Sequence, residues 1–159
     1  MKVSKSHAIE ISKLTVEFNG VPALASVDLK ISEGHIVGIV GESGSGKSTL
    51  ASALIGLLPN SARITSGEIL LDGKEITSAT FEDLQELRGR RISMVSQDTL
   101  SALNPVLTVG EHLIDIQFRE KISFAEKRQR SIAALESVRM PDPEARMSMY
   151  PHELSGGQK

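Results

Sequence analysis

The chain has 159 residues, of which 40% are hydrophobic and 24% charged, so it is long enough for a domain with a hydrophobic core and has the composition of a soluble globular protein. It contains no cysteine, which excludes disulfides, thiolate metal sites and a cysteine nucleophile. A formal net charge of -2, with no Trp and one Tyr, disfavours a nucleic-acid partner. The most apolar short run, Ile36 to Gly41, is too short to span a bilayer, and residues 1–11 lack the apolar stretch of a signal peptide. We therefore expect any link to a membrane to go through a partner protein.

The first third of the sequence predicts β-strands. Residues 9–18 and 23–31 alternate apolar and polar side chains, as half-buried strands do, and the turn-forming stretch Asn19 to Pro22 separates them. Residues 35–41 are instead almost continuously apolar and β-branched. That pattern predicts a central parallel strand buried on both faces.

Shorter elements follow in the middle of the chain. Residues 47–58 predict a helix, and residues 67–76 predict a hairpin that turns at an Asp-Gly pair. Thr80 is the expected N-cap of a short helix over residues 81–87. Residues 91–98 predict a second buried strand that runs into a polar loop.

The last third predicts helices with defined starting points. The pairs Thr108 with Glu111 and Ser123 with Glu126 have capping-box spacing, and the second opens a helix to about residue 138. We expect its inward face to carry Phe124, Leu135 and Val138. Asp142 and Pro143 predict the cap and first turn of a further short helix. We place the domain boundary after Gln97, which gives a mixed α/β part over residues 1–97 and an all-helical part over residues 98–159.

A glycine-rich stretch, GESGSGKST over residues 41–49, fits the P-loop pattern G-x-x-x-x-G-K-[ST] at every fixed position. Its glycines permit positive φ and close backbone approach, so that successive N–H groups can converge on phosphate oxygens at a helix start. Lys47 would place a charge by the β- and γ-phosphates, and Ser48 would offer a hydroxyl to Mg²⁺. The alternative is an accidental glycine-rich turn, but the apolar run before it and the helix after it favour a phosphate site. The predicted nucleotide-binding residues of this loop are Gly41, Glu42, Ser43, Gly44, Ser45, Gly46, Lys47, Ser48 and Thr49.

Hydrolysis would need more than this loop, namely a carboxylate at the end of a second apolar strand. Asp72 follows three apolar residues, but an Asp-Gly pair between alternating segments favours a hairpin instead. No other apolar run in the chain ends in Asp-Glu. We therefore expect the hydrolytic half of the site to be missing from these residues.

The stretch LSGGQ, Leu154 to Gln158, resembles the signature sequence of ABC-type ATPases, with a flexible linker as the alternative. Its place about a hundred residues after a P-loop makes the combination specific. The resemblance extends from about Ile9 to Lys159 and implies a P-loop NTPase (ABC ATPase) fold of the α/β class. That fold would have an N-terminal antiparallel β part, a partial parallel core sheet with the P-loop, and a helical subdomain.

The same resemblance implies roles for single residues. Phe18 falls where the family stacks an aromatic ring on adenine; a core Phe is the alternative. Gln97 matches the glutamine that senses Mg²⁺ and the γ-phosphate, so Lys47 and Gln97 are the catalytic candidates, and Ser48 and Gln97 the metal candidates. The signature would contact the ATP of a second copy, through Ser155, Gly156, Gly157 and Gln158. The basic cluster Arg88, Arg90 and Arg91 is interpreted as solvated surface.

The pieces LRG at residues 87–89 and LNPVLTVGE at residues 103–111 resemble one branch of the family, the importers of oligopeptides, dipeptides or nickel. This implies an ATP-binding subunit that uses ATP and Mg²⁺, pairs with a second ABC ATPase subunit, docks on membrane permease subunits, and serves a substrate-binding protein indirectly. It would lie on the cytoplasmic face of a prokaryotic plasma (inner) membrane, peripherally. No nucleic-acid partner is expected.

Members of this family continue past the signature to a Walker B strand, a catalytic glutamate and a switch histidine, which these residues do not contain. We therefore expect a chain that stops inside the module and does not hydrolyse ATP by itself. Two other functions stay open. A soluble ABC-type ATPase of DNA repair or translation would predict basic surface or long coiled-coil insertions, and a non-catalytic nucleotide-binding fragment would need neither.

Overall fold

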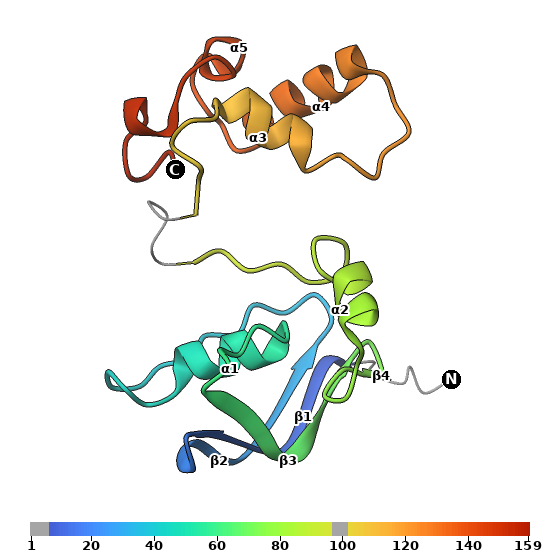
Figure 1. The fold of residues 1–159 in the computed structure, drawn as a ribbon, viewed down its shortest axis with the longest axis vertical. Coiled ribbons are helices and arrows are strands. Elements are labelled where there is room, and N and C mark those ends of the chain that lie inside the picture. The colour runs from blue at the N-terminus through green and yellow to red at the C-terminus, as the bar shows by residue number, and fades with distance from the viewer. Residues whose placement is uncertain (1–6, 97–101) are drawn as a thin grey trace. The chain divides into compact units, whose positions relative to one another are not determined.

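The computed structural model describes residues 7–96 and 102–159 (Figure 1). The chain divides into two compact units, Met1–Met94 and Val95–Lys159. The first unit holds an antiparallel sheet with helices, and the second is helical. Gln97 lies outside the described residues.

The sheet of the first unit has four antiparallel strands in the order β2-β1-β3-β4 (Figure 1). The strands are β1 (His7–Phe18), β2 (Val21–Ser32), β3 (Ala62–Leu71) and β4 (Lys74–Glu75). The two alternating segments predicted near the N-terminus are confirmed as β1 and β2. Because β1 pairs with both β2 and β3, it lies in the middle of the sheet.

A bulge in β1 explains an irregular step in its apolar pattern. Ile11, Leu14 and Val16 are all almost fully buried, although the first step between them is three residues and the second is two. Lys13 has φ 51 and the strand pairing shifts there, so the bulge accommodates one extra residue. The side chains after the bulge therefore still face the same side of the sheet. The buried face of β1 is thereby kept continuous.

Helix α1 (Lys47–Leu54) packs on the buried face of this sheet through Leu50 and Ala53. It ends four residues earlier than predicted. Arg88 explains the stop, because its Nε donates to the carbonyl oxygen of Ile55 (2.8 Å) and its Nη2 to that of Gly56 (2.7 Å). These bonds satisfy carbonyl groups that a helix end leaves without partners. The interpretation of Arg88 as solvated surface is therefore wrong. Arg91 pairs with Asp72.

The predicted hairpin and the short capped helix are confirmed. Asp72 and Gly73, with φ 49 and φ 76, form the two-residue turn between β3 and β4. Helix α2 (Phe81–Leu87) begins at Thr80, whose side chain accepts from the backbone N–H of Asp83 (3.2 Å). The Asp83 carboxylate in turn accepts from the Thr80 backbone, which completes a capping box.

The two strands predicted to be buried in a parallel core sheet are not formed among the described residues. Residues 35–42 belong to no strand, and Ile36 and Val40 are 103% and 94% exposed. In the second segment a single bridge joins Arg88 to Ile92, and Val95 is 91% exposed. The reason is that no strand in residues 7–96 or 102–159 pairs along either segment, so both apolar runs lack the neighbours that would cover them.

The second unit contains α3 (Val109–Asp115), α4 (Phe124–Ser137), α5 (Pro143–Arg146) and a 3₁₀ turn at Pro151–Glu153. The capping box that opens α3 is confirmed in both directions. At α4, the Ser123 side chain accepts from the N–H of Glu126, but the Glu126 carboxylate does not accept from the Ser123 N–H, so only half of the predicted capping box is formed. In the described part of the chain, no helix is long and apolar enough to cross a membrane.

The predicted inward face of α4 is only partly right. Leu135 is buried, whereas Phe124 and Val138 are 68% and 69% exposed because they lie at the two ends of the helix. The contact of α4 with α3 has a polar part: the Gln117 side-chain nitrogen lies within hydrogen-bond distance of the Leu113 carbonyl (2.8 Å), Ser131 Oγ (3.0 Å) and the Lys127 carbonyl (3.2 Å), and its two N–H groups are shared among these acceptors. Ser131 is 2% exposed.

The short helix α5 begins at the predicted Asp142-Pro143 pair, but Asp142 does not cap it with its side chain. Asp142 has φ 49, in the left-handed region, and Pro143 occupies the first turn. Proline is favoured there because the first N–H groups of a helix have no partner within it.

Candidate nucleotide-binding site

The loop before α1 is curled in the way a phosphate cradle requires. Gly44 and Gly46 have φ 83 and φ 87, which side-chain-bearing residues rarely adopt. Gly41 does not have positive φ, but a Cβ added there would lie 2.8 Å from Ser45 Oγ. Gly41 is therefore needed for close approach, while Gly44 and Gly46 are needed for the turn itself.

The end of the loop is seated on the sheet. A Cβ at Gly46 would lie 2.6 Å from Cδ2 of Leu24 and 2.7 Å from the carbonyl oxygen of Ala23. Leu24 is buried and pairs across the sheet with Val16 in the centre of the core. The first turn of α1 is thus fixed by the core, while Gly41–Ser45 and Ser48 remain exposed.

Lys47 closes the loop with its ammonium group. Its Nζ donates to the carbonyl oxygens of Gly41 (2.8 Å) and Glu42 (2.6 Å) and to Ser45 Oγ (3.2 Å). Residue 47 is also the first of α1, and no acidic residue lies in that first turn. A positive charge and the positive end of a helix therefore meet at one exposed loop.

This arrangement fits the phosphates of a nucleotide and a magnesium ion. A methyl group at Gly41 would clash with Ser45, and one at Gly46 would clash with Leu24 and Ala23, so the curled backbone depends on glycine at both positions. The exposed hydroxyl of Ser48 lies in the first turn of α1 and is a hard oxygen ligand of the kind Mg²⁺ prefers. Outside this loop, the described residues hold no group of three or more His, Asp or Glu side chains that could bind a metal ion by themselves.

Phe18 lies at the end of β1 and remains partly exposed. It pairs with Val21 and Ala62, on the neighbouring strands, and is not among the residues of the described core cluster. Val16, two residues earlier, pairs with the Leu24 that supports Gly46. Phe18 therefore lies at the same end of the sheet as Ala23 and Leu24, which contact the loop at Gly46.

The signature stretch lies in the second unit, where one buried residue, Leu154, is followed by an exposed turn. Leu154 is 7% exposed, whereas Ser155, Gly156 and Gly157 are exposed. Gln158 closes the turn, since its side-chain oxygen accepts from the Ser155 N–H (3.0 Å) and its own N–H donates to the Ser155 carbonyl (3.0 Å). Within residues 7–96 and 102–159, no atom of a non-neighbouring residue would lie within 4 Å of a Cβ built at either glycine, so their backbone is open to a ligand.

One structural residue near the signature was missed by the sequence prediction. The N–H groups of Val109 and Gly110, at the start of α3, donate to the carbonyl oxygens of Met149 and Met147, both at 2.8 Å. A Cβ at Gly110 would lie 2.7 Å from the Met147 carbonyl oxygen. α3 is thereby tied to the segment that leads into the signature. A glycine in the first turn of a predicted helix was the available signal.

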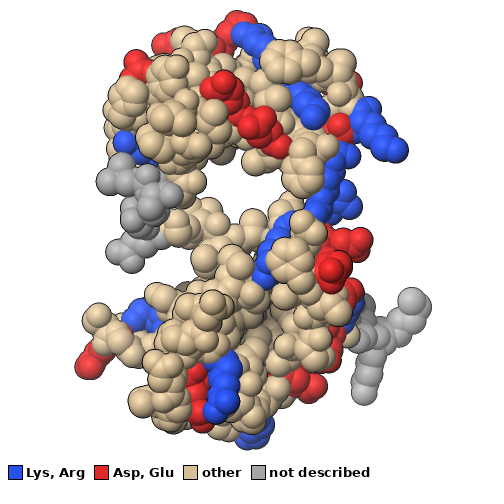
Figure 2. Space-filling model, viewed as in Figure 1, with Lys and Arg blue, Asp and Glu red and all other residues tan. Residues whose placement is uncertain are grey.

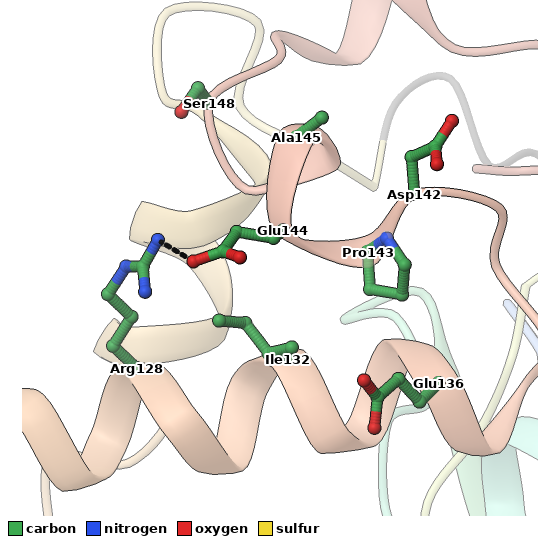
Figure 3. Close-up of a pocket in the computed structure, with 8 residues that line it drawn as sticks. All are labelled: Arg128, Ile132, Glu136, Asp142, Pro143, Glu144, Ala145 and Ser148. Atoms are coloured by element: carbon green, nitrogen blue, oxygen red, sulfur yellow. Dashed lines mark hydrogen bonds and ion pairs between the residues drawn. The ribbon is translucent and has the colours of Figure 1, made fainter.

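The second unit also has a cleft of about 740 Å³ between α4 and α5 (Figure 3). Arg128 and Glu144 form an ion pair across it, with 3.1 Å between Nη2 and Oε1. None of the predicted site residues that the structure describes lines this cleft. Figure 2 shows Lys and Arg mixed with Asp and Glu on the visible face of each unit.

Comparison with known proteins gives one family and a consistent set of relatives. A family model described as "ABC transporter" matches residues 24–159. The oligopeptide transport ATP-binding protein OppD of Salmonella typhimurium is 41% identical over 156 residues, which cover 95% of this chain and 46% of that protein. The dipeptide transport ATP-binding protein DppD of Bacillus subtilis is 40% identical over 141 residues, which cover 87% of this chain and 42% of that protein. The chain thus spans about half the length of the curated relatives it matches.

Solved structures agree with this result. A dimeric, post-hydrolysis structure of the ATP-binding cassette MJ0796 bound to ADP and Pi has a TM-score of 0.76 and 28% identity, covering 94% of this chain and 64% of that one. The cbiO1 protein of Clostridium perfringens, part of the ABC transporter complex cbiONQ, has a TM-score of 0.77 and 27% identity, covering 96% and 57%. The predicted fold class, that of an ABC ATPase cassette, is confirmed by these neighbours.

Proposed function

This chain belongs to the ABC transporter family, and from that premise we infer that it is the nucleotide-binding part of an importer's ATP-binding subunit. The proposed cargo is a peptide or a related small solute, because relatives with about 40% identity are oligopeptide and dipeptide transport ATP-binding proteins. The observation that carries the proposal is the Lys47 ammonium at the curled, exposed start of α1.

ATP is the proposed ligand of the loop at residues 41–49. The exposed backbone N–H groups and Lys47 would hold its phosphates, and Phe18 would stack on the adenine. Ser48 and Gln97 would hold Mg²⁺, which when bound neutralises charge on the phosphate oxygens. Lys47 would turn from the neutral carbonyl oxygens of Gly41 and Glu42 toward the phosphates, whose negatively charged oxygens attract the ammonium group more strongly.

The proposed partner at the signature is a second ABC ATPase subunit. Ser155, Gly156, Gly157 and Gln158 would contact the ATP held by that subunit's loop, and the exposed turn at these residues supports this role. The dimeric state of the MJ0796 cassette is in accord with it. Hydrolysis would be an activity of the whole protein acting as such a dimer.

Permease subunits are the proposed membrane partners of the second unit. Val106, Ile116 and Phe118 are 74%, 71% and 71% exposed, and apolar side chains this exposed suit burial by another protein. The protein would then lie peripherally on the cytoplasmic face of the inner membrane and serve a substrate-binding protein indirectly.

The test is ATP binding to the full chain, measured by titration calorimetry with Mg²⁺, for wild type and Lys47→Ala. We expect the variant to bind at least about thirtyfold more weakly, from the loss of charge-assisted bonds of about 2 kcal/mol or more. Lys121→Ala, an exposed lysine in the second unit, is the matched control and should bind like wild type. Equal affinity of wild type and Lys47→Ala would contradict the site.

The transport assignment has a separate test. Cells that carry the whole protein with Lys47→Ala should lose uptake of labelled di- and oligopeptides while the protein is still produced. If Lys47→Ala loses ATP binding but peptide uptake is unchanged, the assignment of the nucleotide site would stand and the proposed cargo would be overturned.

A further inference from the structure

His112, on α3, makes two hydrogen bonds with backbone groups of opposite character. Its Nε2 lies 2.9 Å from the backbone nitrogen of Asn104, and its Nδ1 lies 2.7 Å from the carbonyl oxygen of Thr108. A backbone N–H can only donate and a carbonyl oxygen can only accept. The ring must therefore be neutral, with its proton on Nδ1 and a lone pair on Nε2.

Through these bonds the ring holds the loop that precedes α3. Asn104 organises this loop: its side-chain oxygen accepts from the N–H of Val106 (3.2 Å), and its carbonyl oxygen accepts from that of Leu107 (3.2 Å). The far end of the loop is fixed independently by the Thr108 capping box. His112 thus connects α3 to the Asn104 end of the loop.

Protonation would remove that connection. In the imidazolium form both ring nitrogens carry hydrogens, so Nε2–H would face the Asn104 N–H, and two donors cannot bond to each other. The bond from Nδ1 to Thr108 would persist. We propose that His112 is a pH-sensitive latch, which holds Asn104 and its turn against α3 when neutral and releases them when protonated. Histidine is suited to this because its charge changes near neutral pH.

No other group in the loop or its capping box is expected to change its charge when His112 is protonated. The Glu111 carboxylate accepts from the Thr108 N–H (2.6 Å) and hydroxyl (2.8 Å), and these bonds hold the pKa of Glu111 below its usual value. Glu111 therefore stays ionised while an imidazole titrates, and the capping box is kept. Residues 104–107 contain no titratable side chain.

Two arginines on neighbouring elements have partners of their own, and the segment that follows α5 carries Tyr150, His152 and Glu153. Arg146 donates to the Pro141 carbonyl (3.1 Å), and Arg130 pairs with Glu126 (3.1 Å). The remaining charged residues on α3 and on the packed faces or ends of α4 and α5 are Asp115, Lys127, Arg128, Glu136 and Glu144. The latch is a property of the second unit and does not depend on the function proposed above.

The experiment follows the ring and the loop together by NMR, in the full chain labelled with ¹⁵N, from about pH 8 to about pH 5. At high pH we expect the His112 ring nitrogens to show the tautomer with the proton on Nδ1. As the ring becomes protonated, the Asn104 amide should lose its hydrogen-bonded proton shift and exchange faster with solvent. Base-catalysed exchange slows as pH falls, so the expected change has the opposite sign to the intrinsic trend.

Two variants make the result specific. His112→Gln offers a side-chain oxygen that accepts but does not titrate, so its Asn104 amide should be insensitive to pH. His152→Gln is the control, because His152 is exposed and stacks on Tyr150 instead, and it should respond like wild type. A neutral ring with its proton on Nε2, a ring that stays neutral to about pH 5, or an Asn104 amide that ignores the ring titration would each overturn the latch. These three readouts come from the wild-type chain and do not require the variants to fold.

Discussion

The side chain of Ser45 occupies the space directly beside the Cα of Gly41, so that a Cβ at residue 41 would lie 2.8 Å from Ser45 Oγ. The same hydroxyl accepts from Lys47 Nζ at 3.2 Å. Gly41, Ser45 and Lys47 therefore form one small packed group inside the loop. Changes at Gly41 and Ser45 should be coupled.

Gly41→Ala should weaken nucleotide binding by about 1 to 2 kcal/mol, because the Ser45 hydroxyl must turn away and lose its bond with Lys47. Removing that hydroxyl should restore space, since the Ser45 Cβ would lie 3.5 Å away, an ordinary contact. Gly41→Ala with Ser45→Ala should thus bind better than the sum of the single variants predicts, measured as a double-mutant cycle of ATP affinities. Strict additivity would show that the two residues do not share this space.

Gly46→Ala should be more harmful than Gly41→Ala. The new Cβ would meet the Ala23 backbone oxygen at 2.7 Å, which cannot rotate away, and φ 87 is unfavourable for alanine. We expect about 2 to 4 kcal/mol lower stability of the first unit, measured by urea unfolding. A stability within about 0.5 kcal/mol of wild type would contradict the claim that Gly46 packs closely against Ala23 of β2.

Arg88→Ala should destabilise the first unit by about 1 to 3 kcal/mol, because the carbonyl oxygens of Ile55 and Gly56 would lose charged donors. The neighbouring Arg90→Ala is the matched control, since Arg90 is exposed and should change stability by no more than about 0.5 kcal/mol. Urea midpoints at constant slope distinguish the two variants. A loss of no more than about 0.5 kcal/mol for Arg88→Ala would contradict its role at the end of α1.

Gly110→Ala should loosen the second unit, because a Cβ there would meet the Met147 carbonyl oxygen at 2.7 Å and part α3 from residues 147–149. We expect faster hydrogen exchange of the Val109 and Gly110 amides and a loss of about 2 kcal/mol in stability.

Gly157→Ala is the contrasting variant, because a Cβ at this position would lie in open space. It should keep its stability but weaken ATP-dependent dimerisation of the whole protein, and dimerisation like wild type would count against the proposed contact in trans.

Asp83→Asn should reduce stability in a pH-dependent way. The hydrogen bond from the Thr80 side chain, followed by Lys74, holds the pKa of Asp83 below its usual value. A carboxyl group with a lowered folded pKa adds stability above its unfolded pKa, about 3.9, and that contribution is lost as pH falls through the folded value. The wild-type protein and the variant should therefore differ in thermal midpoint at pH 7 and converge near about pH 2. A difference that is constant with pH would show that the Asp83 charge is not involved.

Features specified by neighbours in the sequence were predictable. The Thr80 and Thr108 caps, the Asp72-Gly73 turn and the P-loop each depend on residues a few positions apart, and the structure contains the local geometry expected for each. Segment 35–41 was not predictable in the same way. Its apolar pattern predicts a strand that is covered on both faces. No strand among the described residues pairs with this segment, so that strand is not formed.

Distant contacts account for the remaining differences. Arg88 caps a helix that ends more than thirty residues earlier, and Gln117 joins α3 to α4 where an apolar face was expected. Neither contact leaves a periodic trace in the sequence. The binding roles of Phe18, Gln97 and the signature stay predictions, since no feature of a single chain tests them.

The extra residue at Lys13 also affects how β1 tolerates changes in length. Removing Lys13 would bring Ile11, Leu14 and Val16 into strict two-residue steps, with the same side chains still facing inward. Removing Thr15 instead would reverse the facing of every later residue of the strand, Phe18 included. Related chains one residue shorter in this strand could therefore keep the same inward face if the gap falls at the bulge.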